Sequence, residues 1–408
     1  QLVRRRRCRY PLSTRNRAKE QTRGGLLHTS IPGAPPFYGR GDMACRVAVV
    51  RWSPNDEIGA AIQKGLVELE YQTVFFEPGR PFPKEIDVLF SFGPYGPFPP
   101  VPRQLGELPI GERPIFVHWN TEQIPNLHIP WTIVSRLGAL RSWGERVFDR
   151  FPFLCRIPVL ARLPSKMTRF RYVGDYHYAH RQGWLDLLIE SSEIYASLHR
   201  RKGLNVIFVP WGTAAAWHAD LDIERDIDVL WIGKRRTKRR SLWIDRIRSE
   251  LADRGLTMCV VDNVERRFVY GEERTELLNR SKITLNLLPK WHDDAFSYRF
   301  HVAAGNRTLV VSEPIVPHCP IYRSGIHYVS APVGSVMDTL IYYLDHDEER
   351  QTITDAAHQL VTTHLTFSRS VGAIMESVEG LRDTTPKVPQ SLARSFLWQS
   401  VESERQNG

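Results

Sequence analysis

From Met43 onward the chain alternates short apolar runs with segments whose apolar residues recur at helical spacing. This alternation is typical of α/β units that build a parallel sheet. It occurs in two series, which are separated by a Pro/Gly turn at residues 210–213. We therefore predict two Rossmann-like α/β domains that face each other across a cleft, at residues 43–212 and 213–380, with a tail at 381–408.

The predicted strands of the first series are 46–52, 73–76, 87–92, 115–119 and 205–209, and those of the second are 227–232, 258–261, 283–288 and 308–311. Ser53 and Pro54 predict the N-cap and first position of a helix that carries Ile58 and Ile62. Gly255 is expected to end another helix. Further helices are predicted at 133–149, 184–193, 241–254, 272–279, 298–304, 335–345, 348–363 and 367–380.

The formal net charge of +10 raises the question of a nucleic-acid partner. Residues 1–42 carry ten Lys or Arg and two acidic residues, so this segment holds +8 of that charge and the rest of the chain only +2. The nearly neutral body does not favour nucleic-acid binding. We predict that residues 1–42 are a disordered basic tail, either a targeting arm or sequence translated from upstream of a start at Met43.

No run of about 18 uncharged apolar residues occurs, so we predict no transmembrane segment. The five cysteines are odd in number and lack C-x-x-C spacing, which is typical of a reducing cytoplasm without structural disulfides or zinc. His318 and Cys319 are adjacent, and adjacent side chains rarely point at one target. They are therefore not favoured as a metal or nucleophile pair.

The basic run at 233–240 (GKRRTKRR) lies between a predicted strand and the N-terminus of a predicted helix. Positive charge at that place opposes the helix macrodipole by about 0.3–1 kcal/mol per residue. A bound diphosphate would compensate, because Gly233 allows close backbone approach and the helix N–H groups and basic side chains stabilise anionic oxygens. The alternatives are a solvated basic loop and a nucleic-acid contact.

A second cluster lies at 291–301 (WHDDAFSYRFH), at the predicted carboxyl end of a strand, where doubly wound sheets bind ligands. Its carboxylates suit sugar hydroxyls, Arg299 suits a phosphate, and its aromatic rings suit a sugar or base. The alternative is a polar capping segment whose Phe296 and Phe300 are core anchors.

Residues 270–287 (YGEERTELLNRSKITLNL), 297–301 (SYRFH) and 308–314 (TLVVSEP) resemble the C-terminal domain of CgeB-like, spore-maturation type glycosyltransferases. These belong to the GT-B group, and the resemblance covers roughly residues 205–375. It implies a GT-B fold and transfer of a sugar from a nucleotide-sugar donor bound by the C-terminal half.

The resemblance also implies donor-site residues. Retaining members carry a Glu, seven residues and a second Glu; Asp294 lies at the first position and Val302 at the second, with Glu313 as a substitute. It implies no metal and no separate cofactor, because the nucleotide-sugar is a substrate. The residues expected to contact the donor are Gly233, Arg235, Lys238, Arg239, Ser297, Arg299 and Glu313.

For the acceptor side, His118 and Glu122 follow one predicted strand, and Asp175 and His177 lie in the stretch GDYHYAH. An inverting enzyme needs a general base near the acceptor hydroxyl, and His118 is our candidate. A lone His at a strand end is more often structural, and a retaining enzyme needs no such base. The predicted function is therefore a metal-independent glycosyltransferase acting on a glycan, protein or small-molecule acceptor; the alternative is a catalytically silent glycan-binding or partner-binding module.

Overall fold

The computed structural model describes residues 45–51, 53, 56–93, 98–121, 124–151, 153, 170, 172–235, 237–289, 292–293, 298–316 and 321–384. The chain divides into two units, Gln1–Met43 and Ala44–Gly408, and all the described residues belong to the second. Within them, no helix combines the length and apolar character that crossing a membrane requires.

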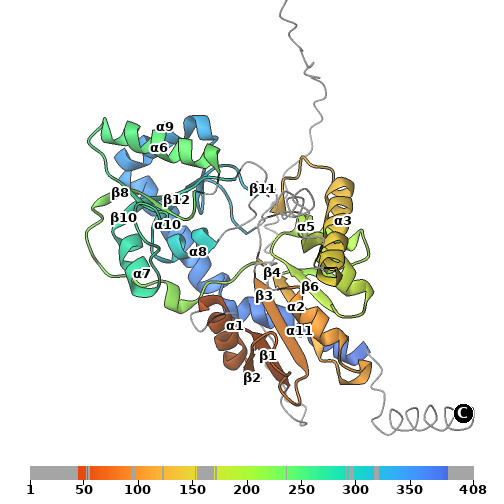
Figure 1. Cartoon of the computed structure of the whole chain (residues 1–408). Coiled ribbons are helices and arrows are strands. Elements are labelled where there is room, and N and C mark those ends of the chain that lie inside the picture. Colours follow the sequence, from red (N-terminus) through yellow and green to blue (C-terminus); the bar gives the residue numbers. More distant parts are fainter. Residues whose placement is uncertain are drawn as a thin grey trace, which may run out of the picture. The chain divides into compact units, whose positions relative to one another are not determined.

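The first sheet is six-stranded and entirely parallel, with the order β2-β1-β3-β4-β6-β7 (Figure 1). Its strands are β1 (Arg46–Val50), β2 (Gln72–Phe76), β3 (Val88–Gly93), β4 (Ile115–Asn120), β6 (Leu187–Glu190) and β7 (Val206–Phe208). The flanking helices are α1 (Glu57–Glu68), α2 (Pro100–Gly106), η1 (Ile110–Glu112), α3 (Trp131–Arg150), an unlabelled helix at 172–181 and α5 (Glu193–Arg200).

The second sheet is five-stranded and parallel, with the order β13-β12-β10-β8-β9. Its strands are β8 (Ile227–Ile232), β9 (Met258–Val261), β10 (Ser281–Asn286), β12 (Leu309–Ser312) and β13 (Val329–Ser330). The helices that follow β7 along the chain are η3 (Ala215–Trp217), α6 (Lys238–Ala252), α7 (Gly271–Asn279), α8 (Tyr298–Gly305), η4 (Val333–Ser335), α9 (Val336–Asp345), α10 (Asp347–Gln359), the π-helical turn η5 (Leu360–His364) and α11 (Phe367–Thr384).

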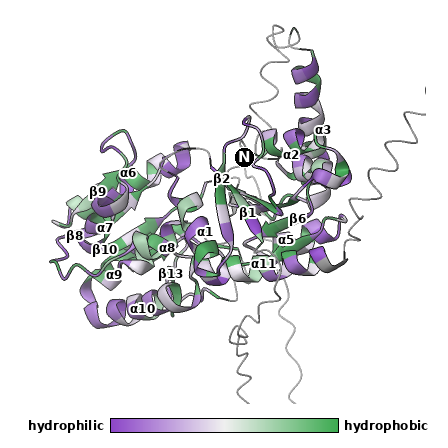
Figure 2. Ribbon diagram, turned by 90° about the horizontal axis from the view of Figure 1, so that it is seen from below, coloured by the Kyte–Doolittle hydropathy of each residue, from purple (hydrophilic) through white to green (hydrophobic). Residues whose placement is uncertain are grey.

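Side-chain alternation along the strands separates the core into layers. Val47 and Val49 of β1 pack with α1 and α11, whereas Ala48 and Val50 pack with α2, α3 and α5. In the second sheet, α6 and α9 cover one face and α7 and α8 the other. Figure 2 shows hydrophobic residues gathered where these elements meet. Both predicted sheets and all nine predicted strands are therefore present, and β6 and β13 are additional to the prediction.

Two local predictions were wrong. Residues 184–193 were expected to be helical, but Leu187–Glu190 form β6, which is buried and paired between β4 and β7. A short apolar run is compatible with either structure, and pairing on both sides decides for the strand. The N-cap of α1 is Asp56 rather than Ser53, because its Oδ1 accepts a hydrogen bond from the Gly59 N–H at 3.1 Å.

The predicted linker at 210–213 runs against a second crossing segment at 365–367. The Thr213 N–H donates to the Leu365 carbonyl at 2.7 Å, and the Phe367 N–H donates to the Thr213 carbonyl at 3.2 Å. A Cβ atom at Gly212 would lie 2.6 Å from the Phe367 backbone. The chain therefore passes between the sheets twice along one track, and glycine is required where the two passages touch.

The last described helix, α11, returns to the first sheet and lies beside α1 (Figures 1 and 2). Tyr71 Oη donates to the Glu379 carboxylate at 2.7 Å, and Val371 and Ile374 pack into the same core cluster as Ile62. The prediction from the sequence assigns residues 367–380 to the second domain. The apolar face of α11 instead completes the layer that covers the first sheet.

Candidate functional site

The carboxyl ends of the central strands of the two sheets are joined by a short antiparallel ladder. β5 (Ile124–Pro125) follows β4, β11 (His292–Asp293) follows β10, and the two pair with each other. In doubly wound sheets ligands bind beyond the carboxyl ends of the strands. The ladder therefore brings the ligand-binding edges of both sheets to one place.

The turn after β8 is built around Gly233 and Arg299. Gly233 has φ of +139°, and a Cβ atom there would lie 2.6 Å from Nη2 of Arg299. The guanidinium of Arg299 donates from Nε to the Ile232 carbonyl at 2.9 Å and from Nη1 to the Asn286 side chain, and it lies 4.6 Å from the Trp231 ring centroid. A half-buried cation is thus held directly against the glycine turn.

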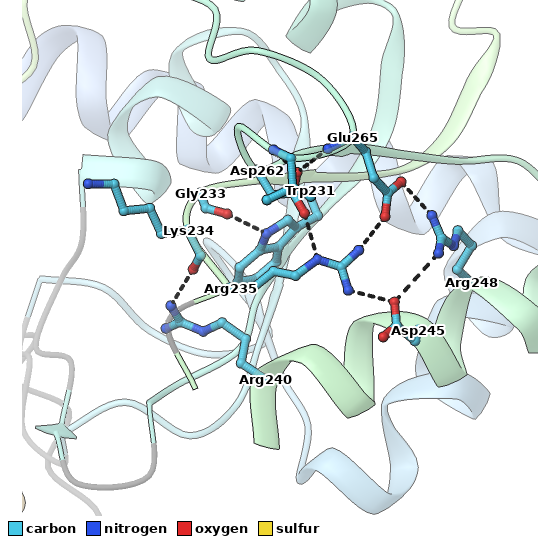
Figure 3. A network of polar contacts seen from close by, with 10 residues as sticks. Trp231, Gly233, Lys234, Arg235, Arg240, Asp245, Arg248, Asp262 and Glu265 are labelled. Carbon is cyan, nitrogen blue, oxygen red and sulfur yellow. Dashed lines mark hydrogen bonds and ion pairs between the residues drawn. The ribbon is translucent and has the colours of Figure 1, made fainter. Parts of the chain in front are cut away.

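Arg235, two residues after Gly233, lies in an ion-pair network (Figure 3). It donates to Asp262 and to Asp245 at 2.5 Å each and also to Glu265, which in turn binds Arg248. Although burial opposes it, the hydrogen bonds to Asp245 and Asp262 raise the pKa of Arg235. The phosphate contact for Arg235 stays a prediction, and three carboxylates already neutralise its charge.

Arg239 at the start of α6 is also paired within the protein. Its guanidinium makes a bidentate pair with Glu313 and donates to the Leu288 carbonyl at 2.9 Å, and the Leu288 N–H donates to Glu313 at 2.7 Å. The hydrogen bond to Glu313 raises the pKa of Arg239. Glu313 thus links the end of β12 to α6. That Glu313 takes the place of the Glu that binds the ribose in retaining members stays a prediction.

The other basic residues of the turn differ in exposure. Arg240 is buried, donates to the Lys234 carbonyl at 3.0 Å and lies over the Trp231 ring (Figure 3). Lys234 and Lys238 are exposed, and no ion pair joins either to another described residue. Much of the positive charge that the sequence analysis attributed to a ligand is therefore balanced by carboxylates, and Lys234 and Lys238 remain beside the turn.

A polar cluster that was not predicted from the sequence joins α1 to α7 and α8. Glu57, the first residue of α1, accepts hydrogen bonds at 2.9 Å from both Arg274 Nη1 and Tyr298 Oη. The side chain of Arg274 is 4% exposed. Burial raises the pKa of Tyr298 although the charge of Arg274 opposes it, and the charge of Glu57 adds to the rise. An acidic residue one position after an Asp N-cap was the available signal, but capping alone explains it in the sequence.

His118 lies in a buried polar chain within the first sheet. Its Nδ1 is 3.1 Å from Ser91 Oγ and its Nε2 is 3.2 Å from Tyr176 Oη, which donates to Asn120 at 3.2 Å; Asn120 in turn donates to Glu190. Burial lowers the pKa of His118 to about 3. The role of general base stays a prediction, and both ring nitrogens already contact protein hydroxyls. His177 lies beside His199, whose Nε2 is 3.4 Å from Glu190 of this chain, and Asp175 accepts a hydrogen bond from Ser142 Oγ.

The remaining predicted positions divide into two groups. Val302 is 3% exposed and belongs to the same core cluster as Phe300, so the second Glu of the retaining pattern is replaced by a buried apolar residue. The others, Asp294, Ser297, Glu122, His318 and Cys319, lie outside the described residues. Within the described residues, no three His, Cys, Asp or Glu side chains are grouped as metal ligands, and metal independence stays a prediction.

Comparisons with known proteins agree with this architecture. Residues 234–376 match a family model described as glycosyl transferase-like, and no curated protein matches the sequence. Sucrose-phosphate synthase from Thermosynechococcus elongatus superposes with a TM-score of 0.52 at 9% identity, over 84% of this chain and 100% of that chain. A glycosyltransferase from Rickettsia africae gives a TM-score of 0.49 at 8% identity over 84% and 100%, and HepE from Anabaena with UDP gives 0.49 at 9% over 83% and 100%.

The likeness to the synthase extends over both sheets and shows the fold, which confirms the predicted fold class. The family match begins directly after Gly233 and ends within α11, so it includes Arg299 and Glu313 but not β8. The chain has the α/β fold that GT-B glycosyltransferases share, and its residues 234–376 match a glycosyl transferase-like family model.

Proposed function

We propose that this protein is a glycosyltransferase that takes a sugar from a nucleotide-sugar donor, with the donor diphosphate bound at the Gly233 turn. The observation that carries the proposal is the contact between Gly233 and Arg299. Because glycine has no Cβ atom, the guanidinium of Arg299 lies directly against the backbone at the carboxyl end of β8. The N-terminus of α6 follows four residues later and adds its macrodipole.

The chemistry needs a group that stabilises negative charge on the departing nucleoside diphosphate. Arg299 supplies a fixed cation, because Asn286, the Ile232 carbonyl and the Trp231 ring hold its guanidinium. Lys234 and Lys238 add exposed positive charge beside the turn. With these cations in place the leaving group needs no metal ion, so we propose metal-independent transfer, with Asp294 near the transferred sugar.

Donor breakdown tests this proposal without knowledge of the acceptor. Release of nucleoside diphosphate from UDP-, GDP-, ADP- and dTDP-sugars is measured for wild type, Arg299→Ala and Arg246→Ala, which removes an exposed arginine of α6. We expect one donor class to be hydrolysed and Arg299→Ala to slow it about a hundredfold or more. Equal rates in the Arg299→Ala and Arg246→Ala variants would refute the assigned role.

A second candidate is a module that binds a donor or glycan without transferring sugar. It is favoured by Val302, whose buried position gives no carboxylate for a ribose. Tight, selective binding of a nucleotide-sugar without release of diphosphate, over a broad panel of acceptors, would select this candidate. The CgeB-like subtype and the cytoplasmic location belong to the first proposal and stay untested with it.

A further inference from the structure

The outward face of α3 is apolar although it is exposed. Ile133, Leu140 and Trp143 have 46%, 56% and 58% of their surface exposed, and Phe151 and Phe153 follow the helix with 44% and 61%. In the helix, positions 133, 140 and 143 fall on one side. Figure 2 shows hydrophobic and hydrophilic residues alternating along α3.

The core contacts of α3 use the opposite side. Val134, Gly138 and Ser142 recur every four residues and are buried. The backbone of Gly138 lies against Gly174 of the helix at 172–181, so the inner side is closely packed. The exposed apolar side chains of α3 therefore do not pack in the core of the first sheet.

The charge on this outward face is positive. Arg136 and Arg150 are exposed along the same side as Trp143. The two acidic residues of α3 fall on the other side of the helix and are paired, Glu145 with Arg141 and the exposed Asp149 with Arg103 at 2.8 Å. Cations interspersed with large apolar side chains, without outward acidic residues, are typical of helices that lie in a membrane interface.

A basic cavity of about 260 Å³ lies beside this face. Ser135 and Ala139 of α3 line it, opposite His177, Arg181 and Lys202. None of its described lining residues carries a carboxylate. Burial, and then the positive charge of neighbouring His, Arg and Lys side chains, lowers the pKa of His177 to about 3. Arg181 and Lys202 supply the positive charge in the lining that suits an anion.

We propose that α3 docks this protein on an anionic membrane surface, with Leu140 and Trp143 among the lipid chains and a lipid phosphate in the cavity beside Lys202. The apolar face and the basic cavity are separate observations, and they share one flank of α3. Neither involves Gly233 or Arg299, so the inference does not depend on the proposed transferase activity.

Co-sedimentation of the full chain with vesicles tests the docking surface. The vesicles contain phosphatidylcholine alone or with about one third phosphatidylglycerol. We compare wild type with the double variant Leu140→Glu, Trp143→Glu and with Leu242→Glu, which places the same charge at a 70% exposed leucine of α6. Burial of a large apolar side chain is worth more than a tenfold change in affinity, so we expect the double variant to partition about tenfold or more weakly.

The comparison also controls for other basic segments. Residues 1–42 are the same in all variants, so their attraction to anionic lipid affects each equally. Leu242→Glu is expected to bind like wild type, and Lys202→Glu to reduce the preference for anionic over neutral vesicles severalfold. Circular dichroism verifies that each variant is folded.

Three outcomes would overturn the inference. The double variant could bind vesicles as tightly as Leu242→Glu, which would leave α3 with no role. Light scattering could show a dimer that the double variant abolishes, without vesicle binding by wild type, which would assign the face to a second copy of the chain. Inorganic phosphate could protect the fold through Lys202 while vesicles do not bind, which would assign the cavity to a soluble anion.

Discussion

At residue scale, Gly233 combines a positive φ with a close contact to a side chain. Its φ of +139° strains any other residue, and a Cβ atom would meet Arg299 at 2.6 Å. Gly255 provides a control, since it has φ of +72° with no atom near its Cβ position. The two glycines therefore separate backbone strain from the contact with Arg299.

We predict that Gly233→Ala and Gly255→Ala each destabilise the fold by about 1–3 kcal/mol, because both residues have positive φ. Only Gly233→Ala should also displace Arg299 and weaken nucleotide binding, by about tenfold or more. Urea unfolding and calorimetric titration measure the two effects. Equal nucleotide affinity in both variants would argue against the Gly233 turn as the phosphate site.

His118 gives a prediction about pH. Burial lowers its pKa from 6.5 to about 3, so the native state keeps it neutral while the unfolded chain takes up a proton as pH falls below about 6.5. Its contribution to stability is therefore full above that pH and is lost progressively between about pH 6.5 and 3. On acidification from pH 7 to pH 4.5, the free energy of unfolding of wild type should therefore fall by about 1–3 kcal/mol more than that of His118→Gln.

The same variant tests whether His118 is a base. Loss of a general base slows a reaction about 10²–10⁴-fold, whereas loss of a buried structural imidazole mainly affects stability. If the difference in free energy of unfolding between wild type and His118→Gln stays constant across the pH range, the buried, neutral state of His118 is contradicted. A pH-rate profile that loses its acidic limb in His118→Gln would identify His118 as the base.

At the scale of elements, the network of Arg235 joins the turn after β8 to α6 and to the loop after β9. The side chain of Asp262 is fully buried; burial acts to raise its pKa, but hydrogen bonds from two backbone N–H groups and from Arg235 outweigh burial and lower it. Such a group contributes stability above its unfolded pKa of about 4, and that contribution is lost as pH falls through the lowered value.

We predict that Arg235→Ala lowers the free energy of unfolding by about 3 kcal/mol at pH 7, since it leaves the buried Asp262 without its cation. Arg248→Ala removes a more exposed partner of Glu265 and should cost about 1 kcal/mol or less. Chemical denaturation of both variants provides the measurement. If the two cost the same, the network is a surface feature and Arg235 is available for a ligand.

Sequence patterns predicted the elements that carry their own signals. The run IDVLWI gave a strand that agrees residue for residue with β8, and Gly255 ends α6 with positive φ. Leu187–Glu190 lacked such a signal, because only neighbouring strands determine that it is a strand. Likewise the partners of Arg235 and Glu57 are distant in sequence, and no local pattern indicates which basic residue meets a carboxylate.

At the scale of the whole molecule, the two sheets share one core cluster. This cluster includes Val49 and Ile62 from the first sheet and its helix, Leu230 and Val310 from the second sheet, and Phe367 from the second crossing segment. We predict a single cooperative unfolding transition, with coincident curves from far-ultraviolet circular dichroism and tryptophan fluorescence. Two separated transitions would show that the sheets are stable independently of each other.

The central claim is that the Gly233 turn and Arg299 bind the diphosphate of a nucleotide-sugar donor. The most direct test is calorimetric titration of the full chain with UDP, GDP, ADP and dTDP, for wild type, Arg299→Ala and Arg246→Ala. The account predicts selective binding of one nucleotide, weakened about tenfold or more by Arg299→Ala and unchanged by Arg246→Ala. Folded wild type that binds none of the four, or an Arg299→Ala variant that binds as wild type does, would contradict it.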